Sequence, residues 1–426
     1  MASTLTTFDA FLKERYADEN EVERLVVENH EFLDMIERDA SGSGKYFDHP
    51  VVVGNPQGLG ATLAKAQTAS EAAGGGGNIQ GKDWISNWGD YSGAITVGDK
   101  VIKAARDSAG SFLRNKAEEV DGLYRSFGDT MEYYLFADAG RALATGTISS
   151  GVVTLVAATE SDIVNIQEGS ILVASANDGT SSGHTLLGSG SVGYVIGVNP
   201  NAGTFTVSAT AGGAAGTPSG WTGTMFFFRD GDFGGGTQGN RILLGAGAWI
   251  PSSDPGATAF EGVDRTLNIQ KLSGTRLTNA EISGLGLEGR LKKLVMRMVG
   301  RGVSPGPTVI FMNPEKWQPL ADSLESRGQR LLDGGSAIFN YKKISLAMSG
   351  RNVDIVSARF CPYHTAFALH TPTIKLRSMD KFPFVVNGDG LDMMRMASSN
   401  SYELRLQAYP AVIFAAPGYC GRVSTL

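Results

Sequence analysis

Residues 142–228 contain no lysine and no arginine, and this gap constrains the fold more than any other feature of the sequence. Alternating apolar and polar residues occur at 192–198 (VGYVIGV) and at 204–210 (TFTVSAT), and the connection NPNAG between them is typical of a β-hairpin. The pattern predicts an all-β module, residues 145–233, inserted into a chain of different character. Its charged side chains before Arg229 are all acidic: Glu160, Asp162, Glu168 and Asp178.

Two helices are expected before this module, separated by an extended region. Apolar residues recur at spacings of three and four over 6–40 and again over 108–143, and the second segment predicts a rod about 50 Å long at 1.5 Å per residue. Residues 44–107 have only short apolar runs between Gly and Pro, which is typical of strands and turns. Loops beyond about 12–15 residues are uncommon in a compact domain, so we expect contacts with other molecules to order this region.

After residue 233 the sequence has α/β character. Apolar residues at helical spacing over 287–298 predict an amphipathic helix, and TVIFM at 308–312 predicts a buried strand. Asn313-Pro314 is expected to open the next helix, because proline is favoured in a first turn. Short strands should follow up to the C-terminus.

Composition limits the class of protein. A chain of 426 residues with 42% hydrophobic and 19% charged residues suits two or three domains with a large core. The formal charge of −6 argues against a protein that mainly coats nucleic acid, and the two cysteines, Cys361 and Cys420, suggest a reducing compartment. The sequence predicts no membrane-spanning segment and no cleavable signal peptide.

Two glycine motifs suggest nucleotide binding, and both lack the required context. The stretch GGGGNIQGKD ends with the P-loop spacing at Gly76–Lys82, but Asp83 replaces the Ser or Thr that would hold magnesium. A small-residue coil at 68–77, not a buried strand, is expected before the motif, and DWISNWGDY after it has no helical stripe. GLGLEG at 284–289 matches the dinucleotide fingerprint, but the preceding LTNAEIS is not a strand. We interpret the first as a loop and the second as a helix entrance or kink, with no bound cofactor.

No catalytic or metal site is expected. GTSSG at 179–183, beside His184, has the spacing of a nucleophile elbow but lies in a turn-rich, helix-free module, so a hairpin tip is the better interpretation. Cys361, His364 and His370 offer only three local metal ligands, and strand-edge positions are expected for the two histidines.

A row of basic residues follows one side of the predicted helix at 287–298. A solvated face is the commonest explanation of such a row, and contact with phosphate or with an acidic neighbouring subunit are the alternatives. The residues are Arg290, Lys293, Arg297 and Arg301.

In the order of these segments the chain resembles the major capsid protein of tailed bacteriophages with the HK97 fold. The resemblance is carried by YFDHPVVVGNPQGLGATLAKAQ (46–67), the long helix after it, VIFMNPEKWQPLADSL (309–324) and YELRLQAYPAVIFAAPGYCGRVSTL (402–426). It implies an α+β HK97-like capsid fold with an inserted all-β domain. The implied parts are an N-arm (1–43), an E-loop with flanking strands (44–107), a P-domain spine helix (108–144), the insertion (145–233), a P-domain segment (234–261), an A domain (262–383) and P-domain return strands (384–426).

The resemblance implies a non-enzymatic shell protein of the virion, assembled in the host bacterial cytoplasm. Copies would form hexamers and pentamers of an icosahedral head that encloses double-stranded DNA through weak, non-specific contact. A portal protein, with scaffold and decoration proteins as further candidates, would be its partners. Three alternatives stay open: an encapsulin-like nanocompartment subunit, a NAD-binding α/β enzyme, and a binding module at 145–233 that recognises a host or decoration protein.

The resemblance also places intersubunit contacts near the tip of the extended hairpin. Large aromatic side chains supply much of the burial at interfaces, so Trp84→Ala or Trp88→Ala is expected to impair shell formation more than folding. Lys82 could donate to a covalent crosslink, although the sequence identifies no partner. We also expect no N-terminal segment to be cleaved. The predicted contact residues are Lys82, Trp84, Ile85, Trp88 and Tyr91.

Overall fold

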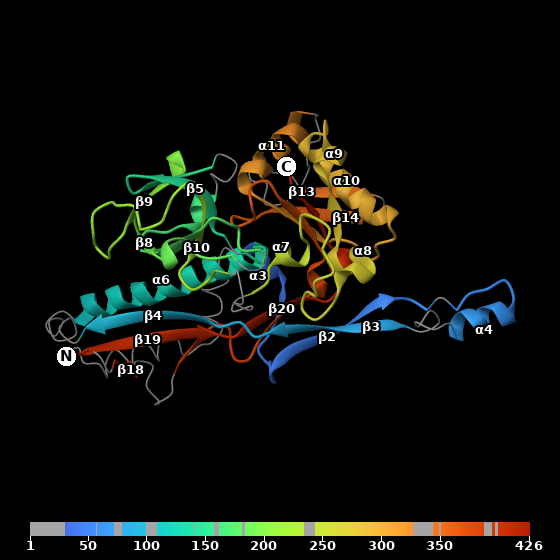
Figure 1. Ribbon diagram of the computed structural model, residues 1–426, viewed down its shortest axis with the longest axis horizontal. Helices are drawn as coiled ribbons and strands as arrows, with labels where there is room; N and C mark the ends of the chain where they lie inside the picture. The colour runs from blue at the N-terminus through green and yellow to red at the C-terminus, as the bar shows by residue number, and fades with distance from the viewer. Residues whose placement is uncertain are drawn as a thin grey trace, which may run out of the picture.

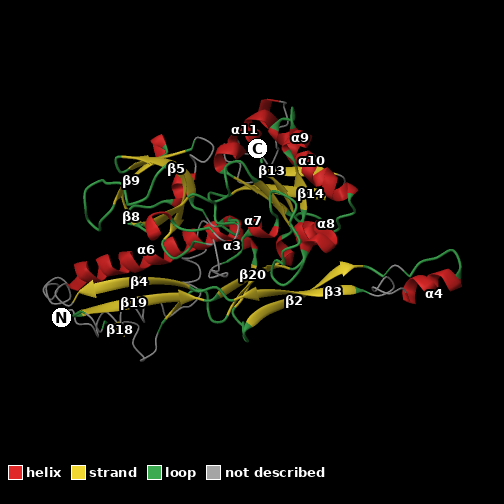
Figure 2. Ribbon diagram, viewed as in Figure 1, coloured by secondary structure: helices red, strands yellow, loops and turns green. Residues whose placement is uncertain are grey.

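A computed structural model describes most of the chain, and every structural statement below concerns the residues that it describes. These are 30–56, 58–71, 79–98, 109–140, 142–156, 162–180, 184–233, 243–326, 344–348, 351–386, 394–396 and 399–426. Helices and strands are both abundant and partly segregated, so the predicted α+β class is confirmed (Figures 1 and 2). None of the described helices is both long and apolar enough to cross a membrane.

The first described elements are a short helix, α3 (Glu31–Met35), and a short strand, β1 (Glu37–Asp39). The helix predicted over 6–40 falls partly outside the described residues, and it is wrong for 37–39. These residues are extended because they pair in parallel with β16 (Ile374–Ser378), from Glu37 opposite Lys375 to Asp39 opposite Arg377. Pairing between distant segments outweighs the local helical pattern here.

The extended region forms a hairpin followed by a third strand. Strands β2 (Tyr46–Gly54) and β3 (Gln80–Asn87) pair antiparallel, and helix α4 (Leu63–Glu71) lies between them in the chain. Strand β4 (Tyr91–Gly98) pairs along its whole length with β19 (Ser401–Ala408). The hairpin points away from the body, with α4 at its far end (Figure 1).

The long helix α6 (Ala109–Phe136) runs beside β4 and packs against it (Figure 1). It is shorter than the predicted 108–143, because the chain turns into the barrel after Phe136. Gly140 lies in this turn, and a Cβ atom there would stand 1.9 Å from the carbonyl oxygen of Asp178. Such close backbone approach suits a glycine turn and excludes a continuing helix.

The charge-poor span folds as a closed six-stranded barrel with the order β10-β5-β6-β9-β8-β7. Its core contains the buried side chains of Trp221, Phe205 and Phe227, with ring centroids 5.3 Å apart for Phe205–Phe227 and 5.5 Å for Trp221–Phe227. The predicted hairpin is present as β8 paired antiparallel with β9. The strands are β5 (Ala144–Ser149), β6 (Val152–Leu155), β7 (Ile171–Ser175), β8 (Val192–Asn199), β9 (Thr204–Ser208) and β10 (Thr224–Arg229).

A six-stranded mixed sheet with the order β11-β21-β15-β12-β14-β13 forms the α/β part, with α9, α10 and α11 near it (Figure 2). The predicted buried strand is β12, and α11 starts at Pro314 as expected. The strands are β11 (Thr275–Leu277), β12 (Val309–Met312), β13 (Ile344–Met348), β14 (Arg351–Ser357), β15 (Ala366–Leu369) and β21 (Gly421–Val423). The helices between the barrel and β13 are α7 (Ala246–Trp249), α8 (Ile269–Ser273), α9 (Asn279–Ile282), α10 (Leu287–Gly300) and α11 (Pro314–Ser326).

The C-terminal strands are divided among three sheets, which differs from the predicted boundary at residue 383. Strand β21 lies inside the six-stranded sheet, between β11 and β15. Strand β20 (Pro410–Phe414) pairs with β16, and β19 pairs with β4, β17 (Phe384–Val385) and β18 (Met394–Arg395). Short 3-10 helices are Leu187–Ser189, Pro200–Ala202, Arg265–Asn268, Thr371–Thr373 and Pro417–Tyr419.

Candidate functional site

The β2–β3 hairpin is anchored to the body through its base. On β2 the side chains of Phe47, Val51 and Val53 are buried, and the Asn268 side-chain amide donates a hydrogen bond to the Val53 carbonyl oxygen at 3.2 Å. On β3 the Ile85 amide donates to the Glu261 carbonyl oxygen at 2.9 Å. The part of the hairpin nearest the body is therefore ordered by contacts within the chain.

The described residues at the far end of the hairpin, 55–56, 58–71 and 79, have a different character. Helix α4 has no buried residue. Leu59, Leu63 and Ile79 are 79%, 75% and 63% exposed, the three highest values among the exposed large hydrophobic side chains of the described residues. An isolated helix of this length is marginal in water, and ordering its backbone costs about 1–2 kcal/mol per residue. Contact with another molecule would supply the missing burial.

The aromatic residues predicted near the tip lie at the base of the hairpin instead. Trp84 is fully buried, with its ring centroid 5.0 Å from that of Trp249 in an edge-on arrangement. Trp88 stacks at 6.1 Å on Phe47, and Tyr91 lies 4.9 Å from Phe127. The prediction of a tip position is wrong, because the hairpin continues outward from β3 to α4.

This position removes Trp84 from the candidate contact surface, since none of its surface is accessible. Lys82 and Ile85 are exposed on β3, and Ile85 retains 42% of its accessible surface. For Lys82 and Ile85, and for the partly buried Trp88 and Tyr91, the intersubunit contact stays a prediction. The sequence signal for the far end is Leu63–Glu71, whose composition favours a helix, whereas strands and turns are predicted for the whole of 44–107.

The P-loop motif does not have the surroundings that it needs. Its first residues, Gly76–Asn78, lie outside the described residues. Gly81, Lys82 and Asp83 belong to strand β3, and the element before the motif is the helix α4. A phosphate-binding loop runs from a strand into a helix, so the described flanks have the reverse order.

The basic row on α10 is largely used within the chain. Arg290 donates to the carbonyl oxygens of Leu285 and Thr425, both at 2.9 Å. Lys293 donates to the Glu281 carbonyl oxygen, and Arg297 donates to the Arg276 carbonyl oxygen and to the Glu281 carboxylate. Only Arg301, at the end of the helix, is classed as exposed. The commonest interpretation, a solvated face, is therefore wrong for three of the four residues.

These contacts fix α9 and the C-terminus against α10. Glu281 also accepts from the Thr278 amide at 2.8 Å, which completes a capping box at the start of α9. The hydrogen bond from Arg297, with that of the Thr278 amide, lowers the pKa of Glu281 to about 2. The GLGLEG motif (284–289) covers the turn after α9 and the first three residues of α10, with Gly286 as the N-cap of α10. The predicted helix entrance is confirmed, and the strand that dinucleotide binding requires is replaced by α9.

The two cysteines make separate contacts and do not form one site with the nearby histidines. The Cys361 thiol lies 3.5 Å from the Thr365 carbonyl oxygen, and Cys420 accepts from the His370 amide at 3.5 Å. Burial raises the pKa of both thiols, that of Cys420 to about 12, so neither is a reactive thiolate. Among the described residues no three His, Cys, Asp or Glu side chains are grouped to hold a metal ion. Residues 181–183 of the GTSSG motif lie outside the described part.

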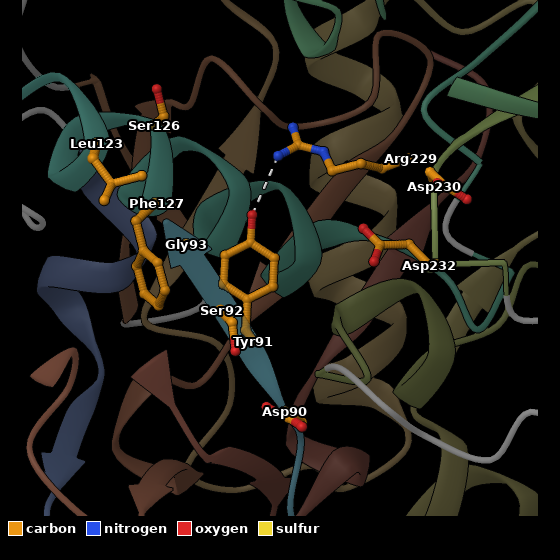
Figure 3. A pocket seen from close by; sticks show the side chains of 11 residues that line it. Asp90, Tyr91, Ser92, Gly93, Leu123, Ser126, Phe127, Arg229, Asp230 and Asp232 are labelled. Atoms are coloured by element: carbon orange, nitrogen blue, oxygen red, sulfur yellow. Dashed lines mark hydrogen bonds between the residues drawn. The ribbon is translucent and has the colours of Figure 1, made fainter. Parts of the chain in front are cut away.

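A pocket of about 580 Å³ lies where β4, α6 and the turn after β10 meet (Figure 3). Arg229 reaches across it and donates to the Tyr91 hydroxyl at 3.2 Å and to the Thr130 hydroxyl at 3.0 Å. Asp232 accepts from the Tyr134 hydroxyl, and burial raises the pKa of this carboxyl to about 7. The lining residues include serine and aspartate side chains but no histidine and no cysteine. Its polar contacts tie the barrel exit to α6.

Comparison with solved structures finds mainly phage capsids, over nearly the whole chain. The cyanophage A-1(L) capsid asymmetric unit matches with a TM-score of 0.48 at 12% identity, covering 93% of each chain. Gordonia phage Cozz matches with a TM-score of 0.42 at 9% identity, covering 93% of this chain and 86% of that one. The holo-SrpI encapsulin complex from Synechococcus elongatus matches with a TM-score of 0.40 at 6% identity, covering 93% and 88%. No family model and no curated protein matches the sequence.

Proposed function

We propose that this chain is the major capsid protein of a tailed double-stranded DNA bacteriophage, with the HK97-like fold that its sequence resembles. The observation that carries the proposal is the far end of the β2–β3 hairpin, which exposes Leu59, Leu63 and Ile79 and buries none of the α4 side chains. In a shell, copies of the same chain are present at high local concentration, so a second copy is the partner that would cover this exposed end. The hairpin would be the E-loop, and α6 the spine helix of the P domain.

The remaining parts take their roles from the same resemblance. The six-stranded sheet with α9, α10 and α11 would be the A domain near the centres of hexamers and pentamers. The barrel would be an insertion open to a host or decoration protein. Portal and scaffold proteins are expected partners, and the host cytoplasm is the expected place of assembly.

A structural role agrees with the chemistry of the described residues. Both thiols are buried, and α9, not a strand, precedes the GLGLEG motif. Contact with DNA should be weak, because the chain carries a formal charge of −6 and three of the four basic side chains on α10 bond to their own chain.

Negative-stain electron microscopy of the purified protein tests the proposal. We expect closed shells of uniform size, or rings of five and six copies that close into shells at higher concentration. A homogeneous single copy at every concentration would contradict it. Nucleic acid inside shells from infected cells would support a phage head, whereas an enclosed enzyme would identify an encapsulin-like compartment instead.

A further inference from the structure

Residues 30–36 form a strap across the long helix α6 and the six-stranded sheet. Phe32 lies between Phe136 of α6 and Phe311 of β12, with ring centroids 4.8 Å and 5.0 Å away. Phe32 and Leu33 are fully buried, and Ile36 is 4% exposed. Apolar packing therefore holds the strap at its centre.

A buried carboxylate of α6 holds the backbone of the strap. Glu132 is 0% exposed, and its two oxygens accept from the amides of Phe32 at 3.1 Å and Leu33 at 3.3 Å. These amides belong to the first turn of α3, where a helix cannot satisfy them itself. The N-cap residue, His30, makes no side-chain capping bond, so Glu132 takes over this role from another element.

A second polar contact lies one turn earlier on α6. The His30 ring is 4% exposed, its Nε2 lies 3.0 Å from Asp129 Oδ1, and it stacks on Phe360 with centroids 6.3 Å apart. The other carboxylate oxygen of Asp129 accepts from Gln167 of the barrel at 3.3 Å. Within the described structure the His30 Nδ1 atom is buried and has no hydrogen-bond partner.

Several titratable groups thus meet where the strap is docked. On the strap they are His30 and Glu31, and on α6 they are Asp129 and Glu132. The thiol of Cys361, in the loop after β14, is within electrostatic range of Glu132, and also of Asp162 and of Arg422 on β21. The largest influences on the pKa of Glu132 are burial, the two amide hydrogen bonds, His30 and Glu31, and none of these is a fixed Lys or Arg charge. The cluster therefore depends on protons to limit its buried negative charge.

We propose that residues 30–36 are a proton-dependent strap, held to α6 more tightly in mildly acid solution than in mildly alkaline solution through Glu132 and His30. The proposal concerns contacts within one chain and does not depend on the proposed function. As the pH rises, the strap should detach from α6 more often while the chain as a whole stays folded.

The direction follows from the two groups together. Burial raises the pKa of Glu132 from 4.5 to about 7, and the two amide hydrogen bonds only partly oppose this. For His30, burial lowers the pKa, but the Asp129 hydrogen bond and the carboxylates around it outweigh burial and raise the pKa above 6.5. A raised pKa means that the docked state binds the proton more tightly. The resulting stabilisation is complete at pH values below the undocked pKa and is lost as the pH rises through the docked value.

Hydrogen exchange of the Phe32 and Leu33 amides in the full chain tests this, with each rate divided by its intrinsic rate. For Glu132 alone, a change of pKa from 4.5 to about 7 predicts protection about tenfold lower at about pH 8 than at about pH 6. Glu132→Gln, which keeps an amide oxygen as acceptor but does not titrate, should remove most of this dependence. His30→Gln should remove a smaller part.

Glu315→Gln, an exposed carboxylate in the first turn of α11, is the matched control and should leave the tenfold change intact. Equal wild-type protection at both pH values would overturn the proposal. A decline that persists unchanged in both Glu132→Gln and His30→Gln would also overturn it. If Glu132→Gln does not fold, the wild-type comparison and His30→Gln decide the outcome.

Discussion

The double substitution Leu59→Ser and Leu63→Ser should prevent assembly without affecting the fold. Fully burying a leucine side chain stabilises by about 1.5–3 kcal/mol. Scaled by the exposed fractions of 79% and 75%, covering both side chains contributes about 2–5 kcal/mol for each hairpin. Since about 1.4 kcal/mol corresponds to a tenfold change, the concentration required for assembly should rise at least about 30-fold.

The unfolding free energy of the single copy should change by no more than about 0.5 kcal/mol for each substitution, because both side chains are already exposed before assembly. Sedimentation velocity over a concentration series measures assembly, and urea unfolding measures the fold. Val152→Ser is the matched control, an exposed apolar residue on the barrel. Normal assembly of the double variant at wild-type concentrations would refute the role given to the hairpin end.

Three further predictions concern the fold. Trp84→Ala should destabilise the single copy by about 3–5 kcal/mol in urea unfolding, because it empties a fully buried site against Trp249, and an unchanged midpoint would contradict this placement. Replacing 144–229 with a short Gly-Ser linker should leave the rest folded, since Ala144 and Phe227 are paired neighbours at the barrel entrance, and loss of near-UV circular dichroism from the aromatic residues outside the barrel would count against it. Glu281 should stabilise α9 at pH values above about 4.5, and this stabilisation should be lost as the pH falls toward about 2. Arg297→Gln should reduce the difference in thermal unfolding temperature between these two pH values, and an unaltered pH profile would argue against the ion pair.

The sequence predicts those elements whose pattern is set locally. The barrel follows from the uncharged, alternating stretch at 142–228, and β8 and β9 lie where the NPNAG turn places them. Strand β12 and the start of α11 at Pro314 follow in the same way from an apolar run and a proline. In each case neighbouring residues contain the whole signal.

The errors arise where distant segments decide the structure. Residues 37–39 continue a helical pattern, but pairing with β16 makes them a strand. Trp84 lies among polar residues in the sequence. Its place in the hydrophobic core becomes clear only from its contact with Trp249, which is distant in the chain. The basic row on α10 has the period of a solvated face, while its partners at Glu281 and Thr425 come from other elements. Glu132, buried on a helix of ordinary composition, gives no local signal of its contact with the strap.

Hydrogen exchange of helix α4 tests most directly whether the hairpin end is ordered by a second copy. The comparison is between residues 63–71 in assembled particles and in single copies separated by dilution. We predict strong protection in the particles and almost none in the single copies, because α4 has no buried side chain of its own. Protection of α4 in a stable, single-copy protein would contradict the account.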